Sequence, residues 1–295
     1  MFKRIGIKDI TFELLVITIM LVICLVIAYP LYFVLIASIT DPDIVNRGGF
    51  LLLPETLYLE GYKKILNYSP LWLGYKNSIV YMIAGTAINL LITIPAGYTL
   101  SRKDLPWRKG FMLLFIFTMV FNGGLVPTYL IVSGLGIRDT IWAMVLPNAM
   151  SVYNLIITKT FFETNLPDEI LEAAKIDGCS DFKFFITIAL PLSKVIIAVI
   201  GLFYAVGHWN SYFQAMIYLN KSELFPLQIV LRNLLIMNEA QGGIINDPMA
   251  MASKMKLAEQ LKYGIIIVSS LPLLLIYPFI QKYFTQGVLI GSVKG

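Results

Sequence analysis

The stretch LVITIMLVICLVIAYPLYFVLIASIT, residues 15–40, contains no Asp, Glu, Lys or Arg. A helix needs about 20 apolar residues to cross the hydrocarbon core of a bilayer. Five more charge-free stretches follow, at residues 77–101, 110–137, 140–158, 195–220 and 263–281. Strands of an outer-membrane barrel would be segments of about ten residues with alternating polarity, and these stretches do not alternate. The sequence therefore predicts an all-α membrane protein with six transmembrane helices.

The overall composition agrees with this class. Of the 295 residues, 58% are hydrophobic and 14% are charged, whereas soluble domains carry about 25% charged residues. We expect one transmembrane domain over residues 1–295. Its predicted spans lie approximately at 13–39, 77–101, 110–133, 141–161, 195–219 and 263–281, with a loop at 162–194 and a C-terminal tail at 282–295.

The N-terminus, MFKRIGIKDITFELL, has the basic start of a secretory signal peptide. However, the apolar run behind it is longer than the roughly 7–15 residues of a signal sequence, and no A-x-A cleavage site follows. We therefore interpret this run as a retained first span.

Basic residues in the links between spans predict the orientation. The link SRKDLPWRKG at 101–110 holds four basic residues, whereas the link at 132–140 holds one, Arg138. Short loops rich in Lys and Arg remain in the cytoplasm. We therefore place the link at 101–110 in the cytoplasm. With six spans, both termini and the loop at 162–194 then also lie there.

The sequence argues against an enzyme or a metal protein. It contains no G-x-x-x-x-G-K-[ST] loop for nucleotide phosphates, no H-E-x-x-H zinc motif and no G-x-S-x-G elbow. Its one histidine is His208. Its two cysteines, Cys24 and Cys179, are predicted at different depths, so we expect neither a disulfide nor a structural zinc site. No cofactor is expected on this chain.

The predicted spans contain no acidic residue, although several carry polar or aromatic side chains. Ionisable residues inside the membrane are typical of ion-coupled carriers, so a self-sufficient carrier is disfavoured. It remains the alternative, because backbone carbonyls can also hold Na⁺. The polar side chains either join helices or line a wet route for a polyhydroxylated solute. The candidates for such a route are Asn122, Asn148, Asn154, His208, Trp209, Asn210, Tyr212 and Gln214.

The loop at 162–194 has the composition of a helix–turn–helix. Pro167 suits the first turn of a helix, and the acidic residues directly after it favour the same end through the helix dipole. Ile170, Leu171, Ala174 and Ile176 are expected to supply apolar contacts, and Gly178 can end the helix in a left-handed conformation. The segment is either a solvated hairpin or a small-faced helix that enters a groove on another protein.

The residues of this loop resemble the EAA signature of binding-protein-dependent ABC importer permeases. Glu172-Ala173-Ala174, three residues, Gly178, nine residues, Ile188, one residue and Leu190-Pro191 match it in type and spacing. The resemblance extends over essentially the whole chain. The six predicted spans and the ending YPFIQKYFTQGVLIGSVKG resemble the carbohydrate-uptake branch, which contains the smaller permease of the maltose importer. The segments FNGGLVPTYL, HWNSYF and SVKG are most similar to its lipoprotein-linked oligosaccharide group. The implied architecture is the type I ABC importer permease fold.

The resemblance implies a division of labour between subunits. The EAA helix would be a coupling helix in a cleft of an ATP-binding subunit, with Glu172 paired to a basic side chain, Ala173 and Ala174 in close contact, and Gly178 at the turn. The last residues of the chain would also reach the ATPase; these are Gly291, Ser292, Val293, Lys294 and Gly295. Expected partners are a second permease in a heterodimer, two ATP-binding subunits carrying ATP and Mg²⁺, and an extracellular solute-binding protein or lipoprotein. The chain would lie in a bacterial cytoplasmic membrane and help to import a carbohydrate, with an oligosaccharide as the expected cargo.

Overall fold

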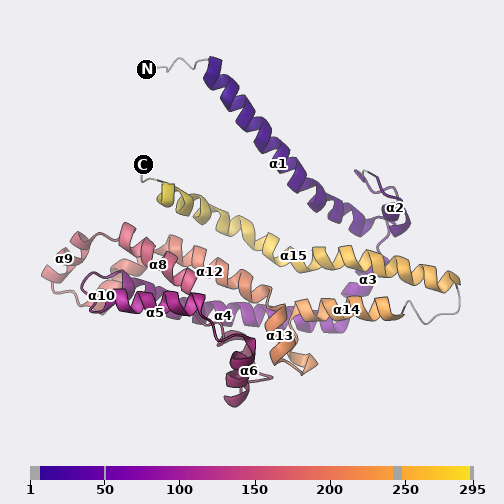
Figure 1. Ribbon diagram of the computed structural model, residues 1–295. Helices are drawn as coiled ribbons and strands as arrows, with labels where there is room; N and C mark the ends of the chain where they lie inside the picture. The colour runs from indigo at the N-terminus through magenta and orange to yellow at the C-terminus, as the bar shows by residue number, and fades with distance from the viewer. Residues whose placement is uncertain (1–6, 50, 242–247, 293–295) are drawn as a thin grey trace. The chain divides into compact units, whose positions relative to one another are not determined.

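The computed structural model describes residues 7–49, 51–241 and 248–292. In these ranges all regular elements are helices, and the one extended pairing is an isolated bridge between Thr40 and Leu57. The chain divides into two compact units, drawn in one ribbon in Figure 1. The first comprises Met1–Ser69 and Leu231–Leu271, and the second comprises Pro70–Val230 and Pro272–Gly295. The predicted all-α class is confirmed.

The first unit contains a long N-terminal helix. It contains α1 (Ile7–Ile39), α2 (Pro42–Asn46), α3 (Glu60–Leu66), and parts of α14 (Leu227–Gln241) and α15 (Pro248–Ser292). The apolar side chains of α1 are largely exposed, as in a helix that faces lipid or another protein.

A buried glutamine joins the helices of the first unit. The Nε2 atom of Gln260 donates to the carbonyl of Ser38 at 3.2 Å and also to the carbonyl of Tyr58. Its Oε1 atom accepts from the amide of Gly61 at 2.6 Å. All three partners are backbone groups in the last turn of α1, in the first turn of α3 or just before α3. Gln260 therefore supplies hydrogen bonds to backbone groups at helix ends inside the unit.

The second unit holds most of the residues singled out above. Its helices are α4 (Ser69–Ser101), α5 (Arg108–Val120), α6 (Leu125–Gly134), α7 (Ile141–Val145), α8 (Val152–Asn165), α9 (Asp168–Ile176), α10 (Asp181–Phe184), the π-helix η1 (Phe185–Ala189), α11 (Leu190–Leu192), α12 (Lys194–Trp209), α13 (Tyr212–Tyr218) and the 3₁₀ turn η2 (Ser222–Leu224). Helix α8 contacts both α5 and α12. Figure 1 shows α9 and α10 beyond one end of α8 and α12, with α13 at the other end of α12.

Three helices in the described part of the chain are long and apolar enough to cross a membrane. They are Thr11–Ile39, Ser69–Ser101 and Ser253–Pro278. Two bent pairs could each add a span: Arg108–Val120 with Leu125–Gly134, bent by 107°, and Asp181–Leu192 with Lys194–Trp209, bent by 79°. Three to five spans are thus supported, and the count of six stays a prediction.

Breaks occur where the sequence offers poor helix formers. The predicted span at 110–133 is interrupted at 121–124, where Gly124 has a positive φ of 84°. The predicted span at 141–161 is divided by the link at 146–151, which includes Pro147. The predicted span at 195–219 is divided at Asn210 and Ser211. Apolar composition gave no sign of these interruptions, because a charge-free run can contain a turn whose backbone groups are satisfied by neighbouring helices.

Candidate functional site

Helix α9 begins and ends at the residues expected from sequence. Pro167 precedes it in an extended conformation, with φ −59° and ψ 145°. Asp168 and Glu169 occupy its first turn and Lys175 its last, so the charges at both ends oppose the helix dipole. The nine-residue helix is too short to be stable alone, and its position therefore depends on contacts with the rest of the second unit.

Gly178 closes α9 by adopting a left-handed conformation. Its φ is +75°, a value that costs an L-residue about 1–2 kcal/mol. Its amide donates to the carbonyl of Lys175 at 3.0 Å, and the amide of Cys179 donates to the carbonyl of Ala174 at 2.9 Å. The chain then reverses, and the hydroxyl of Ser180 caps α10 by accepting from the amide of Lys183. The predicted helix–turn–helix is present.

The inner face of α9 packs on an aromatic core. Ala174 is only 8% exposed and belongs to a buried cluster with Tyr98, Phe162 and Phe184. Leu171 packs against the same cluster. A small side chain at position 174 lets the α9 backbone approach these rings, so Ala174 contacts the core of its own chain.

The later motif residues extend the same core. Ile188 lies in the π-helix η1 and Leu190 begins α11, and both pack against the cluster that contains Ala174. Pro191, in α11, is exposed. Just beyond, at Ser193, the chain bends into α12. The motif residues therefore connect α9 to the start of a predicted span through one packed cluster.

The outer face of α9 has no cover from the described part of the chain. Glu172 and Ala173 are exposed, and Ile176 is 86% exposed. Within the described part of the chain Ile176 does not supply the apolar contact expected of it, because it lies on the side of α9 opposite to the buried Ala174, and a contact of Ile176 with another subunit stays a prediction. Phe182, in α10, is 76% exposed. Large exposed apolar side chains beside an acidic one are typical of an interaction surface.

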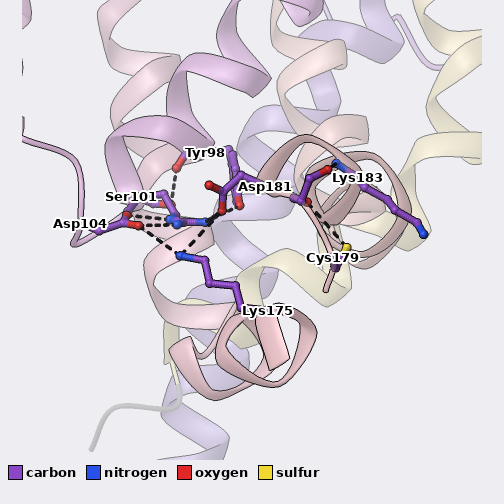
Figure 2. Close-up of polar contacts among 9 residues, drawn as sticks. Tyr98, Ser101, Asp104, Lys175, Cys179, Asp181 and Lys183 are labelled. Atoms are coloured by element: carbon purple, nitrogen blue, oxygen red, sulfur yellow. Dashed lines mark hydrogen bonds and ion pairs between the residues drawn. The ribbon is translucent and has the colours of Figure 1, made fainter. Parts of the chain in front are cut away.

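An ion-pair cluster joins the link after α4 to the helical hairpin of α9 and α10 (Figure 2). The guanidinium of Arg102 binds Asp104 through two hydrogen bonds, of 2.9 and 2.5 Å, and it also contacts Asp181 at 3.2 Å and the Tyr98 hydroxyl at 3.0 Å. The Nζ atom of Lys175 lies 3.6 Å from Asp104 and 3.9 Å from Asp181. Two cations and two carboxylates thus tie three segments together.

Electrostatics within this cluster favour the charged forms. The carboxylate of Asp104 raises the pKa of the Arg102 guanidinium, and the hydrogen bonds from Arg102 lower the pKa of Asp104 to about 2. The Arg102 side chain is only 13% exposed, whereas Asp104 and Asp181 lie nearer the solvent. Bidentate pairs between arginine and carboxylate are stronger than other surface ion pairs, so Arg102 is the centre of the cluster.

Two further ion pairs lie near the first turn of α9. Lys103 Nζ lies 2.5 Å from Asp168 Oδ2, and Arg108 pairs with Glu163 at the end of α8. A cavity of about 290 Å³ lies between these groups, lined among others by Tyr98, Phe162 and Leu171. The link at 101–110 and the loop at 162–194 therefore lie side by side.

A second set of polar residues joins the spans of this unit. His208 Nε2 and Asn89 Oδ1 are 2.7 Å apart, and Asn89 Nδ2 donates to the carbonyl of Asn148 at 2.7 Å. The hydroxyls of Thr93 and Tyr204 are also 2.7 Å apart. Gly85 allows this approach, because a Cβ atom there would overlap the imidazole of His208.

Several of the candidate route residues line cavities beside this network. Asn148, Asn154, His208 and Gln214 line a cavity of about 880 Å³, together with Tyr204 and Ser211. Asn122 lines a neighbouring cavity of about 440 Å³, which also includes Asn148 and Gln214.

The remaining candidates are not among the lining residues of these two cavities. Trp209 is buried and its ring lies 6.1 Å from that of Tyr75. Asn210 donates to the carbonyl of Val206 at the end of α12, and the hydroxyl of Tyr212 contacts the sulfur of Met216. These contacts give the three residues local structural roles.

Some predicted residues lie outside what the structure describes. Gly291 and Ser292 are within α15, while Val293, Lys294 and Gly295 lie outside the described residues. In the ranges that are described, no three His, Cys, Asp or Glu side chains gather as metal ligands, and both cysteines are free thiols.

The sequence alone did not identify the ion-pair cluster, the exposed Phe182 beside α9, or Ser211 as a lining residue of the cavity of about 880 Å³. Arg102 and Asp181 are separated by 79 positions, and no pattern within either segment indicates that they meet.

Comparisons with known proteins agree with this geometry. Residues 68–290 match the family described as "Binding-protein-dependent transport system inner membrane component". The chain is similar to the polygalacturonan/rhamnogalacturonan transport system permease protein YtcP of Bacillus subtilis (strain 168), at 41% identity over 98% of this chain and 100% of that protein. It is also 41% identical to Protein LplC of the same strain, over 90% of this chain and 88% of LplC.

A solved structure gives the same result for the fold. A chain from the crystal structure of a bacterial ABC transporter involved in the import of the acidic polysaccharide alginate has a TM-score of 0.80 and 29% identity, covering 96% of this chain and 99% of that chain. The match in sequence and in fold, together with the apolar helices, shows that this chain belongs to the family of inner membrane components of binding-protein-dependent transport systems.

Proposed function

We propose that this chain is the membrane-spanning permease subunit of an ATP-driven importer of carbohydrates, and that α9 couples it to an ATP-binding subunit. The family supplies the transport role; YtcP is named as a transport system permease protein, and the matching crystal structure is of an ABC transporter involved in polysaccharide import. The observation that carries the coupling role is the two-sided character of α9. Its inner face is fixed by packing and by ion pairs, and its outer face presents Glu172, Ala173 and Ile176 to a partner.

The proposed roles follow the placement of each residue. Glu172 pairs with a basic side chain of the ATP-binding subunit, and Ala173 lets the two surfaces approach. Gly178 fixes the turn, while Ala174, Ile188 and Leu190 pass displacement of α9 to the helices. Pro191 begins the segment that leads through the bend at Ser193 into α12.

The proposed orientation places α9 in the cytoplasm, with both chain termini on the same side. The link at 101–110 carries the highest density of basic residues among the short links, which favours the cytoplasmic side. The ion pairs of Arg102 with Asp181 and of Lys103 with Asp168 support a common side for this link and α9.

The proposed assembly contains a second permease, two ATP-binding subunits and an extracellular solute-binding protein. ATP, Mg²⁺ and hydrolysis are assigned to the ATP-binding subunits, and this chain has no catalytic role. The last five residues, 291–295, are proposed to reach the same ATPase dimer.

The proposed cargo is an oligosaccharide, and an oligomer of an acidic sugar is the first to test. YtcP is named for polygalacturonan and rhamnogalacturonan, and the matching crystal structure concerns alginate. Asn148, Asn154, His208 and Gln214 are proposed to face the route through the cavity of about 880 Å³. The buried hydroxyl of Ser211, also in this cavity, has no hydrogen-bond partner among the described residues and is therefore available to a sugar.

The test is reconstitution in liposomes. The chain alone, and the chain with its second permease, ATP-binding subunits and binding protein, are assayed for uptake of galacturonate oligomers with and without ATP. Uptake that needs all partners and ATP supports the proposal. Uptake by the chain alone, driven by a proton or sodium gradient, contradicts it and indicates a secondary carrier.

A further inference from the structure

A cavity with basic walls lies between the first turn of α5 and the side of α8. Its volume is about 590 Å³, and its cationic lining residues are Lys103, Arg108, Lys109 and Lys159. Trp107, Leu105 and Met112 complete the lining. We call this cavity the basic pocket. The charge-free stretch at 110–137 begins directly after Lys109, one of the lining residues. We therefore place the pocket at the boundary between water and hydrocarbon.

Trp107, which lines the pocket, has an unusual backbone conformation. Trp107 has a φ of 58°, in the left-handed region that non-glycine residues rarely occupy, and its side chain is 84% exposed. Such backbone strain is concentrated at functional sites. An indole ring is favoured at the depth of lipid headgroups, where one edge is wet and the rest is apolar.

The pocket has an excess of positive charge. Arg108 and Lys159 share a single carboxylate, that of Glu163, with Lys159 Nζ at 2.8 Å. Lys103 is paired with Asp168. Lys109 makes no ion pair within the described part of the chain. Four cationic side chains are thus accompanied by two carboxylates, so the pocket keeps a net positive charge that an anion can neutralise.

Helix α5, which begins at the pocket, is apolar and has a face that the described part of the chain leaves exposed. Helix α5 has no buried residue, and Phe111, Leu114 and Phe117 are each at least half exposed. An anion that occupies the pocket and continues along this face must therefore have a long apolar part.

We propose that the basic pocket binds the headgroup of an anionic phospholipid, whose acyl chains lie along α5. The phosphate takes the position between Lys109 and the pair of Arg108 and Lys159, while Trp107 lies at the level of the glycerol. This site is separate from the solute route and from the outer face of α9, and it would tie the link next to the ion-pair cluster to the membrane surface.

The test measures lipid retention by the full chain. The purified chain in detergent is mixed with equal amounts of phosphatidylglycerol and phosphatidylcholine, and the bound lipids are counted by native mass spectrometry. Wild type is expected to retain phosphatidylglycerol in preference to phosphatidylcholine. Lys109→Gln is expected to weaken this retention about fivefold, the effect of one basic residue near an anionic surface. Lys109→Arg is expected to preserve it.

The matched control is Lys76→Gln, which removes an exposed lysine near Trp72 at the other end of α4. It should leave phosphatidylglycerol retention unchanged. The proposal is overturned if wild type holds the two lipids equally, or if Lys109→Gln and Lys76→Gln have the same effect. It is also overturned if Lys109 becomes protected from acetylation only when an ATP-binding subunit is added, because a protein is then the occupant.

Discussion

The Nη1 atom of Arg102 lies 3.2 Å from the Oδ1 atom of Asp181, which joins the link after α4 to the first residue of α10. Asp104 and Lys175 complete the cluster, so each of the charged groups contacts at least one group of opposite sign (Figure 2). Because α9 and α10 form one hairpin that is tied to Arg102 and to the aromatic core, we expect a displacement of α9 to reach the end of α4 through both sets of contacts.

Arg102→Gln should uncouple α9 from α4. The substitution leaves Asp104 and Asp181 with Lys175 alone, and loss of a charged hydrogen-bond network costs about 1–3 kcal/mol. We expect ATP-driven uptake to fall about tenfold while assembly with the second permease is retained. Lys103→Gln, which removes the exposed pair with Asp168, is the control and should have less than a twofold effect. Equal losses in both variants would argue against a special role for Arg102.

Glu172→Lys should weaken the docking of the ATP-binding subunit. The side chain is exposed on the outer face of α9, so the change adds a like charge to a basic partner without disturbing the core. Co-purification of the ATP-binding subunit, quantified from membranes, should fall at least tenfold. Glu223→Lys makes the same charge change at an exposed position of η2 and should have no effect. Unchanged co-purification with Glu172→Lys contradicts the assigned role.

Gly178→Ala should destabilise the turn after α9. A Cβ atom there meets no neighbour within 4 Å, so the cost arises from the φ of +75° and amounts to about 1–2 kcal/mol. Hydrogen exchange should increase in α9, and Gly178→Asn should recover part of the protection. Gly134→Ala, an open position with no positive φ, serves as the control. Equal exchange in the two alanine variants is incompatible with a left-handed turn at 178.

Gly85→Ala should displace His208 from Asn89. The added methyl would overlap the imidazole, and overpacking of this kind costs about 1–3 kcal/mol. The midpoint of thermal unfolding in detergent should fall, and the uptake of sugar should fall with it. Gly207→Ala, where a Cβ atom meets nothing within 4 Å, should leave the midpoint unchanged. A stable Gly85→Ala variant would contradict the close packing of α4 and α12.

Asp104 predicts a pH dependence of stability. Its pKa in the folded chain is about 2, below the value of about 3.9 for an unperturbed aspartate. A depressed pKa stabilises the folded state above the unfolded pKa, and this contribution is lost as pH falls toward 2. The unfolding midpoints of wild type and Asp104→Asn should therefore differ by a constant amount from pH 8 to about pH 4 and converge below it. Convergence already between pH 8 and pH 5 would show that the pairing with Arg102 does not hold.

Much of the fold could be predicted from the sequence because it depends on local signals. Charge-free runs locate apolar helices, and Pro167, Asp168 and Gly178 mark the ends of α9 within the chain itself. Glycine and proline mark the breaks at 121–124 and 146–151, but Pro30 and Pro95 lie inside unbroken helices, because tertiary contacts decide which of these residues ends a helix.

The site was predicted in part for a similar reason. Spacing identifies Glu172 and Gly178, but the burial of Ala174 and the exposure of Ile176 depend on which face of α9 meets the aromatic core. The Arg102 cluster joins segments far apart in the chain, and charge alone does not say which carboxylate an arginine meets.

The most direct test uses a cysteine on the outer face of α9. Cys24 and Cys179 are replaced by serine, Ala173→Cys is introduced, and the complete transporter is treated in the membrane with a short thiol-reactive cross-linker. The account predicts a cross-link from position 173 to the ATP-binding subunit, whose yield changes when ATP is bound. Labelling of the same cysteine by an impermeant reagent added outside intact cells, with no cross-link to any subunit, would contradict it.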